Sequence, residues 1–99
     1  MPPLPIDLHP AAVDEARAAR EWYAERSAAA GTAFMTELDN AIDRIRESPD
    51  RWPADLHETR RYLLKRFPYL VIYRLIEDRI QVIAVAHGKR KPGYWRHRT

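Results

Sequence analysis

The side chains most able to do chemistry are the basic and aromatic ones gathered in the C-terminal part of this 99-residue chain. From Thr59 onward the chain has eleven lysines and arginines and two acids, whereas the residues up to Glu58 include six arginines and twelve acids. Such an asymmetry between halves favours a polyanion or an acidic protein as partner of the basic half. Close-range neutralisation by the acidic half is the alternative, but it leaves an excess of positive charge unexplained.

The basic cluster mixes cations with flat rings, which is the combination that binds unpaired nucleic acid. Lysine and arginine bind phosphates, and tryptophan offers a stacking surface for a base. We therefore predict a set of nucleic-acid-binding residues, which are Arg61, Lys65, Arg66, Lys89, Arg90 and Trp95. The structural alternatives are a solvated strand edge for the arginines at 61 and 66, and a lid folded onto the sheet for Trp95.

Three residues near the end of the chain have the chemistry needed to cleave RNA. Attack by a 2′-hydroxyl requires a base, an acid and a cation that stabilises the phosphorane. His87, Tyr94 and Arg90 are our candidate catalytic residues for these roles. Two of them also have a structural interpretation: His87 would end a strand with its ring bonded to backbone, and Tyr94 would belong to the same lid as Trp95.

Other catalytic classes find no support in the sequence. The chain has no cysteine, its four histidines are scattered, and its three glycines are isolated. These features argue against a metal site and against a phosphate-binding glycine loop, so we expect neither metal nor cofactor. No apolar run is long enough to span a membrane, and the N-terminal residues do not resemble a signal peptide. We expect a cytoplasmic protein.

The N-terminal half is predicted to supply an edge strand and two helices. Ile6 to His9 alternates apolar and polar residues as an edge strand does, and Pro10 ends it. The periodicity predicts helices over 11–30 and 32–48, with Gly31 as the cap of the first and Thr32 as the cap of the second. Their apolar stripes predict an αα-hairpin that packs on a sheet.

The C-terminal half is predicted to form three antiparallel strands, over 59–65, 69–76 and 80–87, with a turn at Glu77-Asp78. A two-residue turn predicts five cross-strand pairs, namely Arg74 with Gln81, Ile72 with Ile83, Leu70 with Val85, Tyr73 with Val82, and Val71 with Ala84. Both faces of this sheet are apolar, and two helices cover only one. We therefore expect the second face to be open for a protein partner or for a second copy of the chain.

Together these elements predict an α+β fold in one domain over residues 1–99, with helices on one face of the sheet. In this order of elements, and in two motifs, the chain resembles the RelE/ParE superfamily of toxins from bacterial type II toxin–antitoxin modules. The motifs are Arg66-Phe67-Pro68-Tyr69 followed by Tyr73, and the stretch from Ala84 to Trp95, which reads AVAHGKRKPGYW.

The resemblance implies a cognate antitoxin as partner and leaves the cellular target open. RelE-type members cleave mRNA on the ribosome, and ParE-type members poison DNA gyrase. Arg90 matches an arginine that the ribonucleases use after the last strand, and Tyr94 is a shifted match to their C-terminal tyrosine. Leu70 stands where they carry an arginine in the central strand. The resemblance thus implies a ribosome-dependent mRNA endoribonuclease, with a gyrase inhibitor and a non-toxic antitoxin-binding remnant as alternatives.

Overall fold

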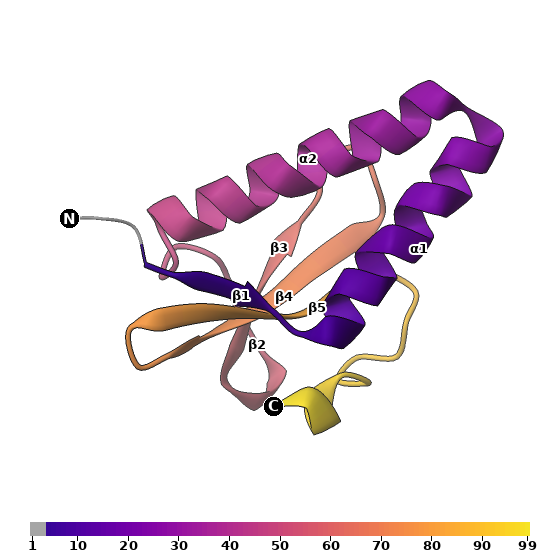
Figure 1. Ribbon diagram of the computed structural model, residues 1–99. Coiled ribbons are helices and arrows are strands. Elements are labelled where there is room, and N and C mark those ends of the chain that lie inside the picture. Colours follow the sequence, from indigo (N-terminus) through magenta and orange to yellow (C-terminus); the bar gives the residue numbers. More distant parts are fainter. Residues whose placement is uncertain (1–3) are drawn as a thin grey trace.

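The computed structural model describes residues 4–99, and its elements follow the predicted order (Figure 1). Two helices pack on one side of a five-stranded sheet, which confirms the predicted α+β fold with an N-terminal edge strand, an αα-hairpin and an antiparallel meander. The strands are β1 (Ile6–Leu8), β2 (Ala54–Asp55), β3 (Thr59–Leu63), β4 (Tyr69–Ile76) and β5 (Arg79–His87). The helices are α1 (Pro10–Arg26) and α2 (Ala28–Glu47), with short 3₁₀ turns at Leu56–Glu58 and Arg96–Arg98.

The sheet has the strand order β1-β5-β4-β3-β2, in which β1 runs parallel to β5 and all other neighbours are antiparallel. The first strand thus lies beside the last one, and the helical hairpin forms the crossover between β1 and the meander. The short β2 lies between the second predicted helix and the first predicted strand of the meander, where the sequence predicted no element. Within residues 4–99, neither helix is long and apolar enough to cross a membrane.

A β-bulge between β4 and β5 changes the predicted register. The pairs next to the Glu77-Asp78 turn, Arg74 with Gln81 and Tyr73 with Val82, are confirmed. Beyond them the predicted pairs are wrong by one residue, because Ile83 is an extra residue on β5. The observed pairs are Ile72 with Ala84, Val71 with Val85, and Leu70 with Ala86. The bulge turns Val85 toward the helices and leaves two alanines on the other face.

The predicted helix boundary at Gly31 and Thr32 is wrong. The chain breaks at Ser27, which has an extended backbone (φ −163°, ψ 125°) and whose hydroxyl oxygen accepts a hydrogen bond from the Ala30 N–H at 3.3 Å. Ser27 therefore caps α2. Gly31 lies inside α2, where an added Cβ would lie 2.7 Å from Cβ of Ala24. This glycine allows the two helices to approach closely.

The main core lies between the helices and the sheet, as their apolar stripes predicted. Phe34 is fully buried, and its ring lies 5.5 Å from that of Tyr23, 5.3 Å from that of Phe67 and 5.2 Å from that of Tyr69. On the sheet side, the buried Tyr73 donates its hydroxyl to the Pro49 carbonyl at 2.6 Å. The other buried residues of this core are Ala12, Ala16, Ala19, Leu38, Ala41, Ile45, Tyr62, Leu64, Val71, Ile80, Val82 and Val85.

The expectation of an open second face is wrong, because residues 93–98, which we call the C-terminal segment, fold back over it (Figure 1). Trp95 is only 3% exposed and packs against Ile72 and Ile83. The small side chains of Ala84 and Ala86 belong to the same cluster and give the indole room to lie on the sheet. The lid interpretation of Tyr94 and Trp95 is therefore the one that describes this part of the chain.

Candidate functional site

A hollow of about 230 Å³, which we call the basic hollow, lies where β5 ends and the chain turns into the C-terminal segment. Its lining brings together five predicted site residues, Arg61, His87, Arg90, Tyr94 and Trp95. The other lining residues are Asp55, Leu70, Ile72, Ala86, Gly88, Lys91, Pro92 and Gly93. Antiparallel pairing explains the gathering, because β3, β4 and β5 present their side chains to one face.

His87 is held by the turn that follows β5. Its Nδ1 accepts a hydrogen bond from the Lys89 N–H at 3.1 Å, and its ring packs edge-on against Tyr69 at 5.1 Å. The Gly88 N–H donates to the Pro68 carbonyl at 2.7 Å, which anchors the turn to the β3–β4 loop. Because Nδ1 is an acceptor, a neutral His87 carries its proton on Nε2 and presents a donor to a ligand.

Arg90 is, with Lys91, an exposed cation in the lining of the basic hollow. Its guanidinium lies 3.9 Å from the ring centre of Tyr94 and makes no ion pair within residues 4–99. Arg61 is partly engaged: it donates to the Ala54 carbonyl at 2.9 Å and lies 4.0 Å from Oδ2 of Asp55. The five donors of a guanidinium suit it to bind a phosphate or a carboxylate, and Arg90 keeps them free.

Tyr94 is tied to α1 by a carboxylate that sequence reasoning missed. Its hydroxyl donates to Oε2 of Glu15 at 2.5 Å, and Arg98 pairs with both oxygens of the same carboxylate at 2.8 and 3.2 Å. Glu15 also accepts from the Val85 N–H at 3.1 Å, and Arg98 donates to the Ile83 carbonyl at 3.1 Å. These contacts cover the edge of β5 beyond the end of β1.

Burial and the hydrogen bond to Glu15 together raise the pKa of Tyr94 well above its ordinary value. Like any tyrosine, Tyr94 is neutral near neutral pH, and the raised pKa makes it a weaker acid than an ordinary tyrosine. The sequence contains a signal for this contact. Glu15 lies beside the buried stripe of α1, which consists of Ala12, Ala16 and Ala19. A charged side chain in that position needs a partner.

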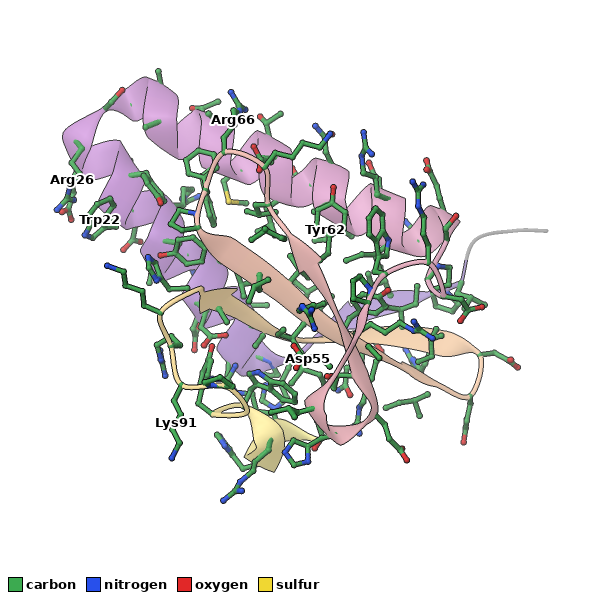
Figure 2. The ribbon with its side chains drawn as sticks, turned by 180° about the vertical axis from the view of Figure 1, so that it is seen from behind. Trp22, Arg26, Asp55, Tyr62, Arg66 and Lys91 are labelled. Atoms are coloured by element: carbon green, nitrogen blue, oxygen red, sulfur yellow. The ribbon has the colours of Figure 1, made fainter. Side chains whose placement is uncertain are left out.

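Lys65 and Arg66 lie away from the basic hollow. Arg66 donates from Nε to Oε1 of Glu37 on α2 at 3.0 Å, and its backbone N–H donates to Oε2 of the same residue at 3.0 Å. Burial raises the pKa of Glu37, but the hydrogen bonds from Arg66 outweigh burial, so the pKa is lowered. Figure 2 shows Arg66 beside α2 and Lys91 on the opposite side of the sheet.

The remaining predicted residues differ in their availability. Lys89 and Lys65 are exposed, so both are free to meet a polyanion. Trp95 is buried against the sheet and edge-on to His57 at 5.9 Å, so its ring faces are not open to a base. Residues 4–99 contain no group of three or more histidines and acids placed to hold a metal ion.

Comparison with known proteins places this arrangement in a family. Residues 6–92 match the family described as ParE toxin of type II toxin-antitoxin system, parDE. A solved structure described as a chromosomal ParDE TA system from P. aeruginosa superposes with a TM-score of 0.75 at 15% identity, over 85% of this chain and 95% of that chain. No curated protein sequence matches the chain. The chain therefore belongs to the ParE toxin family of type II toxin–antitoxin systems.

Proposed function

We propose that this toxin acts by binding DNA gyrase and that it cleaves no RNA. The observation that carries the proposal is the engagement of its acid–base groups in structural contacts. The Tyr94 hydroxyl donates to Glu15, and Nδ1 of His87 accepts a backbone N–H. Leu70 supplies no cation in the central strand. The basic hollow is equipped to bind an anionic surface through Arg90 and Arg61.

The chemistry of RNA cleavage fits these contacts poorly. A general base for the 2′-hydroxyl must be unprotonated and within hydrogen-bond reach of it. His87 offers Nε2–H in its neutral form, and Tyr94, which is protonated at neutral pH as tyrosines ordinarily are, has a pKa raised still further from that range. A binding function needs neither group to transfer a proton. It needs only positioned cations and a stable surface around them.

A cognate antitoxin is the second partner that we propose. The P. aeruginosa relative is described as a ParDE toxin–antitoxin system, and the basic C-terminal half of this chain favours an acidic partner. We place the toxin in the cytoplasm, where both proposed partners work. The antitoxin would then compete with gyrase for the toxin by mass action.

Purified protein tests the proposal in a gyrase supercoiling assay. We expect inhibition at micromolar concentration, at least tenfold weaker inhibition by Arg90→Ala, and unchanged inhibition by His87→Ala, because the proposed contacts are made by Arg90 and Arg61 and not by His87. Arg79→Ala is a matched control, since Arg79 lies at the far end of β5 and pairs with Asp7. Lack of inhibition by folded wild-type protein would contradict the proposal.

One observation keeps mRNA cleavage as a second candidate function. Arg61, His87 and Arg90 line one hollow, and Nε2 of His87 is not used by another hydrogen bond within residues 4–99. Primer extension on mRNA from expressing cells separates the two functions. New cuts within codons that disappear in His87→Ala would establish the ribonuclease and reject the binding mechanism.

A further inference from the structure

A second cleft, of about 420 Å³, lies on the other side of His87, between α1 and the end of β5. We call it the aromatic cleft. Three rings line it, those of Trp22, Tyr23 and Tyr69, and the small side chains of Ala18 and Ala19 leave room between them. His87 and Arg90 contribute to this cleft as well as to the basic hollow. Its volume falls in the range of sites that hold one small ligand.

Of the three rings in the aromatic cleft, that of Trp22 is the exposed one, and those of Tyr23 and Tyr69 are half-buried. Trp22 and Tyr23 meet at 83° with their centres 5.0 Å apart, and Tyr69 meets His87 at 80°. Each edge-to-face contact occupies a face of one ring only, whereas Tyr23 is in addition stacked on Phe34 at 23° with the ring centres 5.5 Å apart. Trp22 remains 49% exposed, and Arg26 covers one of its faces at 3.4 Å (Figure 2). A planar ligand would meet the exposed part of this ring.

The charges at the end of the cleft favour an anion. Arg90 has no anionic partner within residues 4–99, and His87 adds a second nitrogen donor. The one carboxylate in the lining belongs to Glu15, and it is already balanced by Arg98 and by hydrogen bonds from Tyr94 and Val85. An incoming anion therefore meets an unpaired cation without meeting an unpaired acid.

A ligand that matches both features has a flat ring joined to an anionic group. We propose that the aromatic cleft binds one unpaired nucleotide of a single-stranded nucleic acid, with the base beside Trp22 and the phosphate at Arg90 and His87. Stacking on aromatic rings tolerates any base, so this site gives little sequence preference. The site differs from the surface proposed for gyrase, although His87 and Arg90 line both cavities.

The test is a titration of the isolated protein, monitored by NMR. The titrants are a pentadeoxyuridylate, a pentauridylate, inorganic phosphate and an acidic peptide of ten residues that contains tryptophan. We expect the oligonucleotides to shift the resonances of Ala18, Ala19 and the Trp22 indole, and to bind far more tightly than phosphate alone. Comparison of the two oligonucleotides reports whether the site distinguishes the sugar.

Four variants make the test specific. Trp22→Ala and Arg90→Ala are each expected to weaken oligonucleotide binding at least fivefold, which is the low end for loss of one stacked base. Arg96→Ala and Leu63→Ala are matched controls with no expected effect, because both residues are exposed and lie outside the cleft. Thermal unfolding of each variant verifies that it is folded.

Three outcomes would overturn the proposal. The first is the absence of oligonucleotide binding at low salt. The second is that Arg90→Ala and Arg96→Ala weaken oligonucleotide binding equally and Trp22→Ala has no effect. That result would mean that the oligonucleotide is attracted by net charge alone. The third is a peptide that shifts the cleft resonances when oligonucleotides do not, which makes the cleft a protein-docking site. None of these results depends on gyrase, so the two proposals stand or fall separately.

Discussion

The two faces of the sheet are covered in different ways. On one face, two helices of 17 and 20 residues bury a continuous apolar core. On the other face, the C-terminal segment covers a small cluster around Trp95, and polar contacts to Glu15 hold it in place. The helix-covered face draws its stability from apolar area, whereas the second face depends on a few directional contacts.

This difference matters for function because the basic hollow lies beside the C-terminal segment, which is the less firmly held of the two covers. Arg90 rests on the ring of Tyr94, and Tyr94 is held by Glu15. Elements with few buried apolar contacts open locally at lower free energy than the core. We therefore expect the C-terminal segment to exchange its amide hydrogens faster than the sheet beneath it, without unfolding of the helices.

Phe34→Ala tests the helix-covered face and should have the largest effect. The ring is fully buried among Tyr23, Phe67 and Tyr69, so its removal leaves a cavity in the main core. We expect a loss of about 3–5 kcal/mol in the free energy of unfolding, measured by urea denaturation. Leu63→Ala, at an exposed leucine, is the control and should change stability by less than about 0.5 kcal/mol. A loss below about 1 kcal/mol for Phe34→Ala would show that the helices are not the principal cover.

Glu15→Gln tests the cover of the second face and should have an intermediate effect. It leaves the Arg98 cation, only 10% exposed, without its carboxylate. Loss of one partner of a buried pair costs about 3–5 kcal/mol, but a segment held by few apolar contacts can move its cation into water. We expect Glu15→Gln to lower the free energy of unfolding by about 2 kcal/mol. Faster hydrogen exchange should be confined to residues 93–98 and β5.

The matched control for that experiment is Glu21→Gln, an exposed acid on the same helix. It removes the same charge without touching the C-terminal segment. If Glu15→Gln accelerated exchange equally in α2, the segment and the hairpin would form one cooperative unit, and the contrast between the two faces would be lost.

Periodicity was sufficient to predict the helix-covered face. The stripe from Phe34 to Ile45 and the strand runs at 69–76 and 80–87 identified the correct elements and most of the core. The Ile83 bulge was not predictable by the same reasoning. β5 is apolar on both faces, so no alternation of polar residues fixed its register beyond the turn. That one-residue shift is what gives Trp95 two alanines to lie on.

The site was predictable only where neighbouring strands brought it together. Arg61, His87 and Arg90 gather because β3, β4 and β5 are adjacent, and an antiparallel meander implies that adjacency. The Glu15 contacts join residues 79 and 83 positions apart. The helix pattern indicates that Glu15 needs a partner, but no local pattern identifies Tyr94 or Arg98 as that partner. The aromatic cleft was missed because Trp22 and Tyr23 fit equally well as members of a helix stripe that packs on the sheet.

Two tyrosine substitutions give the smallest and most selective comparison of the two faces. Tyr94→Phe removes a hydrogen bond to a carboxylate under the C-terminal segment, and Tyr73→Phe removes one to a backbone carbonyl on the helix-covered face. Each should cost about 1–2 kcal/mol at pH 7. Burial raises the pKa of Tyr73 to about 12. Burial, and to a smaller extent the hydrogen bond to Glu15, raises the pKa of Tyr94.

The pH dependence of the two variants follows from these directions. A tyrosine whose pKa is raised by folding contributes its full stabilisation below about pH 10, the ordinary value, and loses it as the pH rises toward the folded pKa. Wild-type protein should therefore lose stability above pH 10, and each variant should lose less. Urea denaturation monitored by circular dichroism from pH 9 to 12 should report the Tyr73 contribution as global unfolding.

The Tyr94 contribution needs a local measurement, and hydrogen exchange is too fast to follow at this pH. Cleavage within residues 93–98 by an alkaline protease should therefore report Tyr94. If wild-type protein resisted that cleavage at pH 11 as well as at pH 9, the Tyr94–Glu15 contact would not control the cover of the second face.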